Sequence, residues 1–123
     1  MKKYYLPILL SLSLGACSHT RKAIYAAAGS PLTDNELNAS HAEKNFSLYC
    51  SRCHGLDGQG AGPDAAGLSS TLPNFSDGSF KKSEGLLAAN IAYGKGEMPA
   101  FQKILNEKEI WSLAKYVLTL ADR

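Results

Sequence analysis

The chain has 123 residues, which is enough for one domain but too short to bury a large hydrophobic core without help. Its 13 Lys and Arg residues and 11 Asp and Glu residues give a formal net charge of +2. A nucleic-acid-binding protein needs a clear excess of basic residues, so the composition argues against that class of partner.

The first 16 residues have the pattern of a secretory signal peptide. Residues 1–3 carry two lysines, residues 6–14 are mostly apolar, and small residues follow at a cleavage site. The apolar run is too short to span a bilayer. We therefore expect residues 1–16 to be removed on export, which would leave equal numbers of acidic and basic residues in the mature chain.

Cys17 ends a Leu-Gly-Ala-Cys run that resembles a bacterial lipobox, in which the cysteine is lipidated and becomes the mature N-terminus. The alternative is an ordinary signal peptide with a chance cysteine. The count of three cysteines favours lipidation. Two of them form a Cys-x-x-Cys motif at residues 50–53, and the third would otherwise be a free thiol in an oxidising compartment. Several acyl chains give stable membrane attachment. Because Ser18 follows rather than Asp, we expect a periplasm-facing protein on the outer membrane of a Gram-negative bacterium.

Residues 17–32 are expected to form a flexible connector between the lipid and the folded domain. They combine small and polar residues with Gly29, Ser30 and Pro31, which interrupt any helix. Such a tether would hold the domain near the membrane surface while allowing it to tumble. The domain itself is expected to occupy residues 33–123.

The first predicted helix of this domain starts at a capping box formed by Ser40 and Glu43 and runs into Cys50. After His54, a run of glycines over residues 55–63 indicates a tight loop, which we interpret as backbone lying close to the edge of a cofactor. A phosphate-binding loop is disfavoured because the run has no lysine and no preceding strand. The inner face of the helix is expected to consist of Ala42, Phe46, Tyr49 and Cys50.

Two further helices are predicted. One begins at Ser83 and Glu84 and ends at Gly94, because glycine is common just past a helix C-terminus. The last is capped by Asn106 and Glu109. No segment sustains the alternation typical of a strand, so we predict an all-α fold of about three to four helices. The apolar faces are expected to be Leu86, Leu87, Asn90 and Ile91 in one helix and Ile110, Leu113, Ala114, Val117 and Leu118 in the other.

Residues 50–54 read Cys-Ser-Arg-Cys-His, the pattern of a covalent haem attachment site. Cys50 and Cys53 are three residues apart, so on a helical turn both thiols share one face and can bond the two vinyl groups of one porphyrin. His54 can then bind the iron. A dithiol redox pair is an alternative, but it usually accompanies a βαβ pattern. A zinc site would need further ligands in a tetrahedral arrangement.

A second axial ligand to the iron is expected at Met98, the one methionine besides Met1. It lies in a loop between two predicted helices, where Pro99 stiffens the backbone. A thioether ligand favours reduced iron and raises the reduction potential. The alternative is that Met98 only fills a gap in the core. Other candidate ligands are His19, His41 and, at high pH, Lys95.

Four sequence runs carry a family resemblance. They are the Cys-Ser-Arg-Cys-His-Gly motif, the Gly-x-Gly-x-Gly-Pro run ending at Pro63, the Gly-Lys-Gly-x-Met-Pro-x-Phe run around Met98, and the closing Glu-Ile-Trp-x-Leu-x-x-Tyr-Val helix. Together they make residues 40–123 similar to a class I, monohaem cytochrome c. The resemblance implies the cytochrome c fold, in which helices wrap around one covalently bound haem c and the first and last helices cross.

The resemblance also implies particular contacts. The Pro63 carbonyl would accept the Nδ1 hydrogen of His54 and so fix the tautomer of the imidazole. Residues 64–79 carry no long insertion, which is typical of a short bacterial member. Asn74 and Trp111 are candidates to bond a haem propionate, and the alternative is that both are only structural. The helix crossing is expected where Ala42 and Phe46 face Leu113 and Tyr116.

Such a protein is expected to carry single electrons rather than to be an enzyme, because two strong axial ligands leave no open position on the iron. We expect a monomer that meets redox partner proteins and is attached to a membrane through Cys17. Alternatives are a haem-bearing subunit of a larger membrane or dehydrogenase complex, a haem sensor or peroxidase-like protein with a labile sixth ligand, and a purely structural lipoprotein.

The near-zero net charge of the mature chain argues against strong electrostatic steering of redox partners. Four lysines are candidates for a docking face near the haem edge, and the alternative is that they are scattered over a solvated surface: Lys81, Lys82, Lys95 and Lys103.

Overall fold

The computed structural model describes residues 16–33, 36 and 38–123. Residues 1–15 of the expected signal peptide lie outside the described residues, as does the side chain of Cys17. Export and lipidation therefore stay predictions. No helix among the described residues is both long enough and apolar enough to cross a membrane.

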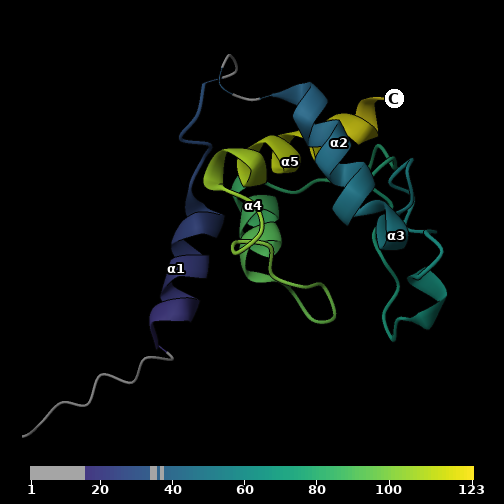
Figure 1. The fold of residues 1–123 in the computed structure, drawn as a ribbon, viewed down its shortest axis with the longest axis horizontal. Helices are drawn as coiled ribbons and strands as arrows, with labels where there is room; N and C mark the ends of the chain where they lie inside the picture. Colours follow the sequence, from purple (N-terminus) through teal and green to yellow (C-terminus); the bar gives the residue numbers. More distant parts are fainter. Residues whose placement is uncertain (1–15, 34–35, 37) are drawn as a thin grey trace, which may run out of the picture.

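The described part of the chain is all-α, as predicted (Figure 1). Within it, the only β-type pairing is one isolated antiparallel bridge, between Lys95 and Met98. The elements in chain order are α1 (Ala16–Ala27), α2 (Ala39–Tyr49), α3 (Ser51–His54), the 3₁₀ turn η1 (Ala65–Gly67), α4 (Glu84–Tyr93), α5 (Glu107–Thr119) and the 3₁₀ turn η2 (Leu120–Asp122).

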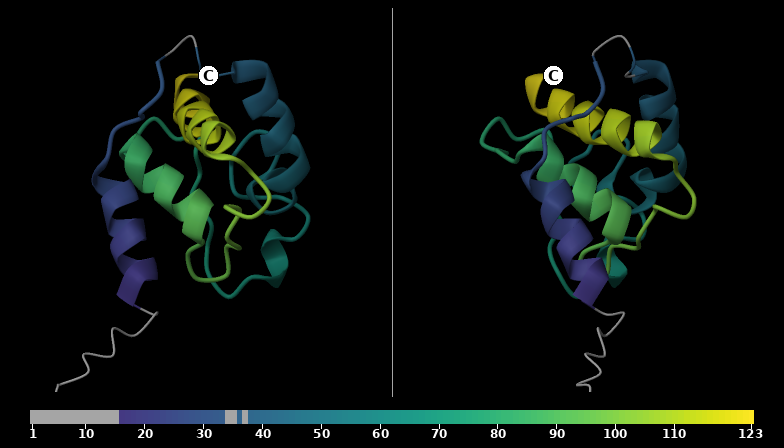
Figure 2. Two further views of the ribbon diagram at one scale, coloured as in Figure 1. Left: turned by 60° about the vertical axis from the view of Figure 1, so that its left-hand side comes forward. Right: turned by 90° about the vertical axis from the view of Figure 1, so that its left-hand side faces the viewer.

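Helix α5 lies at the centre of the helical layer, with α2 on one side and α4 on the other (Figure 2). The predicted crossing of α2 and α5 is confirmed: Ala42 and Phe46 are buried against α5, and the rings of Phe46 and Tyr116 lie 5.4 Å apart between centroids. Leu113 has no exposed surface. Small and aromatic side chains thus let the two helices approach closely over the core.

Helix α2 begins two residues earlier than predicted. The N-cap residue is Asn38 rather than Ser40, and the Asn38 side chain accepts the hydrogen bond from the His41 backbone N–H at 3.0 Å. Asparagine is a strong N-cap residue, so the local pattern allowed either start. The expected inner face is also wrong at its end, because Tyr49 is 41 % exposed.

Helix α5 begins at the predicted capping box. The Asn106 side chain accepts the Glu109 backbone N–H at 3.0 Å, and the Glu109 carboxylate accepts the Asn106 backbone N–H at 2.8 Å. Two otherwise unpaired backbone donors are satisfied in this way. The buried residues include Trp111 and Tyr116 beside the predicted stripe, because α2 and α4 cover different sides of the helix.

Helix α4 has the predicted limits, with the Ser83 hydroxyl capping its start and Gly94 ending it. Its buried surface is wider than the single apolar face expected from the sequence. Leu87 and Ile91 are buried, but Leu86 and Asn90 are only half-buried, and small residues occupy the rest of the covered surface. The reason is that α5 packs on one side of α4 and α1 on the other.

Helix α1 corrects the prediction of a flexible connector. Residues 16–27 are helical and pack along α4 (Figures 1 and 2). A Cβ atom added at Gly85 would lie 2.1 Å from the Ala28 carbonyl oxygen, so the two backbones are in direct contact. The ring of Tyr25 stacks on Trp111 with centroids 5.2 Å apart. The helix ends before the Gly-Ser-Pro sequence at 29–31, where the sequence predicted a break.

Candidate functional site

The Cys-Ser-Arg-Cys-His motif forms the junction of α2 and the one-turn helix α3. The Cys50 backbone N–H donates to the Phe46 carbonyl as the last bond of α2, and the Cys50 carbonyl in turn accepts from Cys53 at 3.2 Å and His54 at 2.9 Å. Both cysteines are half-buried free thiols. Burial, and secondarily the neighbouring Cys53, raises the pKa of Cys50 to about 12. Reactive redox cysteines have lowered thiol pKa values, so this thiol is unlike those of a dithiol redox pair.

His54 is buried, with 9 % of its surface exposed, and its ring stacks on Phe75 at 4.7 Å between centroids. Burial lowers the pKa of its imidazole, which favours the neutral ring that a metal ion requires. Its Nδ1 atom has no hydrogen-bond partner among the described residues. The predicted bond to the Pro63 carbonyl is therefore not formed, and Pro63 is exposed. A buried ring nitrogen without a hydrogen-bond partner is uncommon in folded proteins.

The glycine-rich loop accounts for the exposed position of Pro63, because the loop backbone is hydrogen-bonded to the C-terminal end of α3. Gly60 donates to the His54 carbonyl at 2.7 Å and Gly62 donates to the Cys53 carbonyl at 3.0 Å. A Cβ atom added at Gly62 would lie 2.3 Å from the Arg52 carbonyl oxygen, so only glycine allows this approach. The loop thus pairs the last carbonyls of α3 and frames the motif from one side.

A bidentate ion pair fastens the same loop from outside. The Arg52 guanidinium donates to the two Asp64 carboxylate oxygens at 2.6 and 2.9 Å. The Arg52 hydrogen bond lowers the pKa of the Asp64 carboxyl. This pair could not be predicted from the sequence, since oppositely charged residues 12 positions apart form no recognisable pattern.

Met98 lies in a tight turn that follows α4. Lys95 and Met98 exchange both backbone hydrogen bonds, at 3.1 and 3.0 Å, and Gly94 starts the turn with a φ of 75°. A Cβ atom added at Gly94 would lie 2.6 Å from the Met98 carbonyl oxygen. The Met98 side chain is half-buried against the hydrophobic core, as is Cys50.

An aromatic contact brings the two halves of the candidate site together. Tyr49 directly precedes the first cysteine of the motif, and Phe101 follows Met98 by three residues; their rings lie 6.1 Å apart between centroids. Phe101 is in turn held to α4 by its backbone N–H, which donates to the Ile91 carbonyl at 2.9 Å. The cysteine motif and the Met98 turn therefore border one region of the molecule.

Comparison with known proteins decides the family. Residues 37–117 match the family model described as cytochrome C oxidase, cbb3-type, subunit III. The chain belongs to this cytochrome c family. It is 30 % identical over 86 residues to the cytochrome c6 of Leptolyngbya boryana, a match that covers 70 % of the chain and 96 % of the relative. It is also 35 % identical over 72 residues to the cytochrome c6 of Chlorolobion braunii, covering 58 % of the chain and 79 % of that relative.

A similar solved structure is a chain of the Kuenenia stuttgartiensis reducing HAO-like protein complex Kustc0457/Kustc0458. It matches with a TM-score of 0.63 and 27 % identity over 77 % of the present chain. The match spans 48 % of that chain, about half of its length. The cytochrome c fold predicted from the sequence is therefore confirmed.

Membership of the cytochrome c family means that the chain carries a covalently bound c-type haem. The residues of the motif fit that group. Cys50 and Cys53 offer two free thiols on one helical turn, and His54 offers a buried imidazole beside them. In contrast, the described residues contain no group of three or more His, Cys, Asp or Glu that could hold a metal ion without a porphyrin.

Glu97 is a structural residue of this cytochrome c that sequence analysis missed. Its carboxylate accepts hydrogen bonds from the Ser69 backbone N–H at 3.0 Å, the Ser69 hydroxyl at 2.8 Å and the Ser70 hydroxyl at 3.3 Å. These bonds lower the pKa of the Glu97 carboxyl. These hydrogen bonds fasten the Met98 turn to Ser69 and Ser70. No local sequence pattern could have indicated a contact between residues 28 positions apart.

Of the other ligand candidates, Lys95 is exposed and lies in the Met98 turn itself. His19 and His41 are exposed, on α1 and in the first turn of α2. Asn74 is exposed, and its side-chain oxygen accepts the Ser76 backbone N–H at 2.9 Å, whereas Trp111 is buried under Tyr25. The proposed propionate contacts of these two residues stay predictions. The four lysines of the expected docking face are all exposed: Lys81, Lys82, Lys95 and Lys103.

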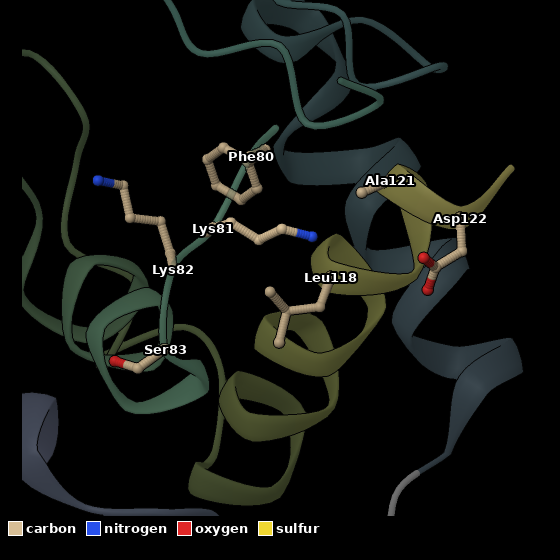
Figure 3. A pocket seen from close by; sticks show the side chains of 7 residues that line it. All are labelled: Phe80, Lys81, Lys82, Ser83, Leu118, Ala121 and Asp122. Carbon is tan, nitrogen blue, oxygen red and sulfur yellow. The ribbon is translucent and has the colours of Figure 1, made fainter. Parts of the chain in front are cut away.

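A surface pocket of about 430 Å³ opens beside the C-terminal end of α5 (Figure 3). None of the haem-motif residues or Met98 lines it. One of its lining residues, Phe80, contacts the Phe75 ring with centroids 5.2 Å apart. In Figure 3 the Lys81 side chain extends toward the C-terminal turn and Lys82 extends the other way. The lining residues are Phe80, Lys81, Lys82, Ser83, Leu118, Ala121 and Asp122.

Proposed function

We propose that this cytochrome c is a periplasm-facing carrier of single electrons, tethered to a membrane through a lipidated Cys17. In this proposal Cys50 and Cys53 bind the haem covalently, and His54 and Met98 bind its iron. The proposal depends on one observation. The helical turn with two free thiols and a buried imidazole borders the same region as a rigid turn with a half-buried thioether. The cytochrome c6 relatives support the carrier function.

The bound haem would supply reversible one-electron chemistry between ferric and ferrous iron. The chain supplies the surroundings of that chemistry. Burial keeps the His54 imidazole neutral and so able to act as a ligand. The Met98 turn is closed by two backbone hydrogen bonds and fastened by Glu97, so the backbone that carries the thioether is held in place. Ligands held rigidly in both oxidation states need little rearrangement when an electron arrives, which favours a carrier.

An optical spectrum of the purified holoprotein in both oxidation states, together with its mass, tests the proposal. The expected result is a Soret band, one haem bound per chain, and the weak long-wavelength charge-transfer band of methionine-ligated ferric iron. Met98→Ala should keep the haem but lose this band and lower the reduction potential. An unchanged band and potential in Met98→Ala would remove the ligand assignment. Tight binding of carbon monoxide by the wild-type ferrous protein would instead favour a sensor or peroxidase-like protein.

The lipid anchor is tested separately from the haem. The mature protein should carry a mass increment of acyl groups at Cys17 and should fractionate with the outer membrane. Cys17→Ser should release a protein with an unchanged haem spectrum into the soluble periplasmic fraction. A wild-type protein without acyl groups would contradict the anchor and leave the electron-carrier proposal standing.

A second candidate function is that of a haem-bearing subunit of a larger complex. Two observations favour it. The matching family model is described as an oxidase subunit, and the similar solved structure is a chain of a protein complex. Solubilising the membranes in mild detergent and measuring the size of the haem-containing species distinguishes the two. A free carrier should migrate as a single small chain, and a subunit should migrate with partner proteins.

A further inference from the structure

Helix α1 lies outside residues 37–117, the region shared with the cytochrome c family, yet it is an integral part of the packed structure. Its backbone touches α4 at Gly85, where an added Cβ atom would lie 2.1 Å from the Ala28 carbonyl and 2.8 Å from the Tyr25 carbonyl. Such an approach fixes the position of α1 along α4. The helix is therefore an addition to the family core with a defined docking site.

Tyr25 gives this docking its second fixed point. Its ring stacks on Trp111 at 5.2 Å and meets Tyr93 edge-on at 5.8 Å between centroids, and its hydroxyl donates to Glu107 at 3.4 Å. Aromatic pairs in these geometries stabilise beyond the area that they bury. Tyr25 thus connects α1 to both α4 and α5, and it touches the last residue of α4.

Lys22 lies almost one turn before Tyr25 and reaches the end of α4. Its ammonium group donates a short hydrogen bond to the carbonyl of Gly94, the residue that caps α4. The last carbonyls of a helix lack partners within the helix, and a cation there is stabilised by the helix dipole. Lys22 therefore stabilises the C-terminal end of α4 from outside that helix.

Gly94 is also the first residue of the Met98 turn. Its backbone lies so close to the Met98 carbonyl oxygen that an added Cβ atom would be 2.6 Å away. Lys95, the next residue, exchanges both backbone hydrogen bonds with Met98. A displacement of the Gly94 carbonyl is therefore transmitted directly to the backbone of Met98.

From this chain of contacts we propose that α1 braces the turn that carries the sixth ligand, and that Lys22 is a positioning residue for Met98. The inference deepens the proposed function, since its effect on the iron rests on ligation by Met98. The bracing of the turn itself does not depend on ligation. Lys22 acts through Gly94 and touches neither the haem nor the iron in this proposal.

The test compares three variants of the mature holoprotein. Lys22→Met keeps the length of the side chain and removes the donor, while Lys22→Arg keeps a cationic donor. Arg21→Met is the matched control, because it makes the same charge change at an exposed position one residue away on the same helix. The readouts are the exchange rates of the Lys95 and Met98 amide hydrogens, the methionine–iron charge-transfer band, and the rate at which added imidazole binds the ferric iron.

In Lys22→Met, the amide hydrogens of Lys95 and Met98 should exchange roughly tenfold faster than in the wild type, and imidazole should bind the iron roughly tenfold faster. A tenfold change is equivalent to about 1.4 kcal/mol. Lys22→Arg should restore most of the wild-type rates, and Arg21→Met should not differ from the wild type. Equal rates in Lys22→Met and Arg21→Met would overturn the inference. If the wild-type protein lacks the methionine band, the ligation proposal fails, while the amide exchange rates still decide whether α1 braces the turn.

Discussion

The imidazole of His54 lies almost parallel to the ring of Phe75, with centroids 4.7 Å apart and planes inclined by 24°. Phe75 is itself fixed, because its backbone N–H donates to the Gly58 carbonyl at 2.7 Å and its ring contacts Phe80. The orientation of the proposed iron ligand is therefore set by a side chain 21 positions later in the sequence, held against the glycine-rich loop. Second-sphere contacts of this kind orient metal ligands.

Phe75→Ala should destabilise the holoprotein by about 3–5 kcal/mol, the range for removing a buried phenylalanine ring. Phe75→Leu fills more of the space and should cost less, about 1 kcal/mol. Guanidinium unfolding of the ferric protein, followed by Soret absorbance, measures both. Ile104→Ala is the control, because Ile104 is 60 % exposed and should change stability by less than about 0.5 kcal/mol. Equal stability of Phe75→Ala and the wild type would show that this ring does not support His54.

Two glycines test how tightly the loop is packed on α3. Gly62→Ala places a Cβ atom 2.3 Å from the Arg52 carbonyl oxygen, and backbone on both sides must move. We expect the free energy of unfolding to fall by about 1–3 kcal/mol and the yield of holoprotein to be reduced. Gly67 has no atom within 4 Å of an added Cβ, so Gly67→Ala should be neutral or stabilise by up to about 1 kcal/mol. Thermal unfolding of the two variants side by side measures the difference, and similar melting temperatures would contradict the observed packing.

The features that could be predicted from the sequence are those encoded by neighbouring residues. The capping box of Asn106 and Glu109 determines the start of α5, and Ser83 and Gly94 delimit α4. The haem motif is likewise a five-residue pattern. Even locally the information was incomplete, since Asn38 and Ser40 are both good N-cap residues and the structure uses Asn38.

The features that could not be predicted depend on contacts between distant residues. Helix α1 has 12 residues, and an isolated helix of that length is marginally stable in water, so its sequence alone indicates a connector. It is helical because Tyr25 and Lys22 find partners on α4 and α5. The Glu97 carboxylate contacts Ser69, which lies 28 positions earlier in the sequence. The His54 Nδ1 atom is unpaired because the glycine-rich loop does not place the Pro63 carbonyl beside it.

The Glu97 contact should control how easily the Met98 turn detaches from residues 68–70. Glu97→Ala removes the acceptor of the Ser69 backbone N–H, so the Ser69 amide hydrogen should exchange several-fold faster. Glu97→Gln keeps an acceptor oxygen and should show a smaller effect. Glu43→Ala, at an exposed position on α2, is the charge-matched control and should leave Ser69 unchanged. An unchanged Ser69 exchange rate in Glu97→Ala would mean that this contact does not hold the turn.

The docking of α1 should weaken at high pH because of Tyr25. Burial of its phenol, with the Glu107 carboxylate as the second cause, raises the pKa of Tyr25 from 10.0 to about 12. A raised pKa means that the packed state prefers the protonated phenol. The contribution of Tyr25 to stability is therefore complete below about pH 10 and is lost as the pH rises toward 12.

Tyr25→Phe keeps the stacked ring and removes the ionisable group, so it separates this effect from other alkaline changes. The difference in phenolate absorbance between wild type and Tyr25→Phe should show one phenol that titrates near pH 12. The free energy of unfolding of the wild type should fall relative to that of Tyr25→Phe between about pH 10 and 12. A difference spectrum that titrates near 10, as for a free phenol, would show that Tyr25 is not packed between α4 and α5 in solution, and that the brace on the Met98 turn lacks its aromatic anchor.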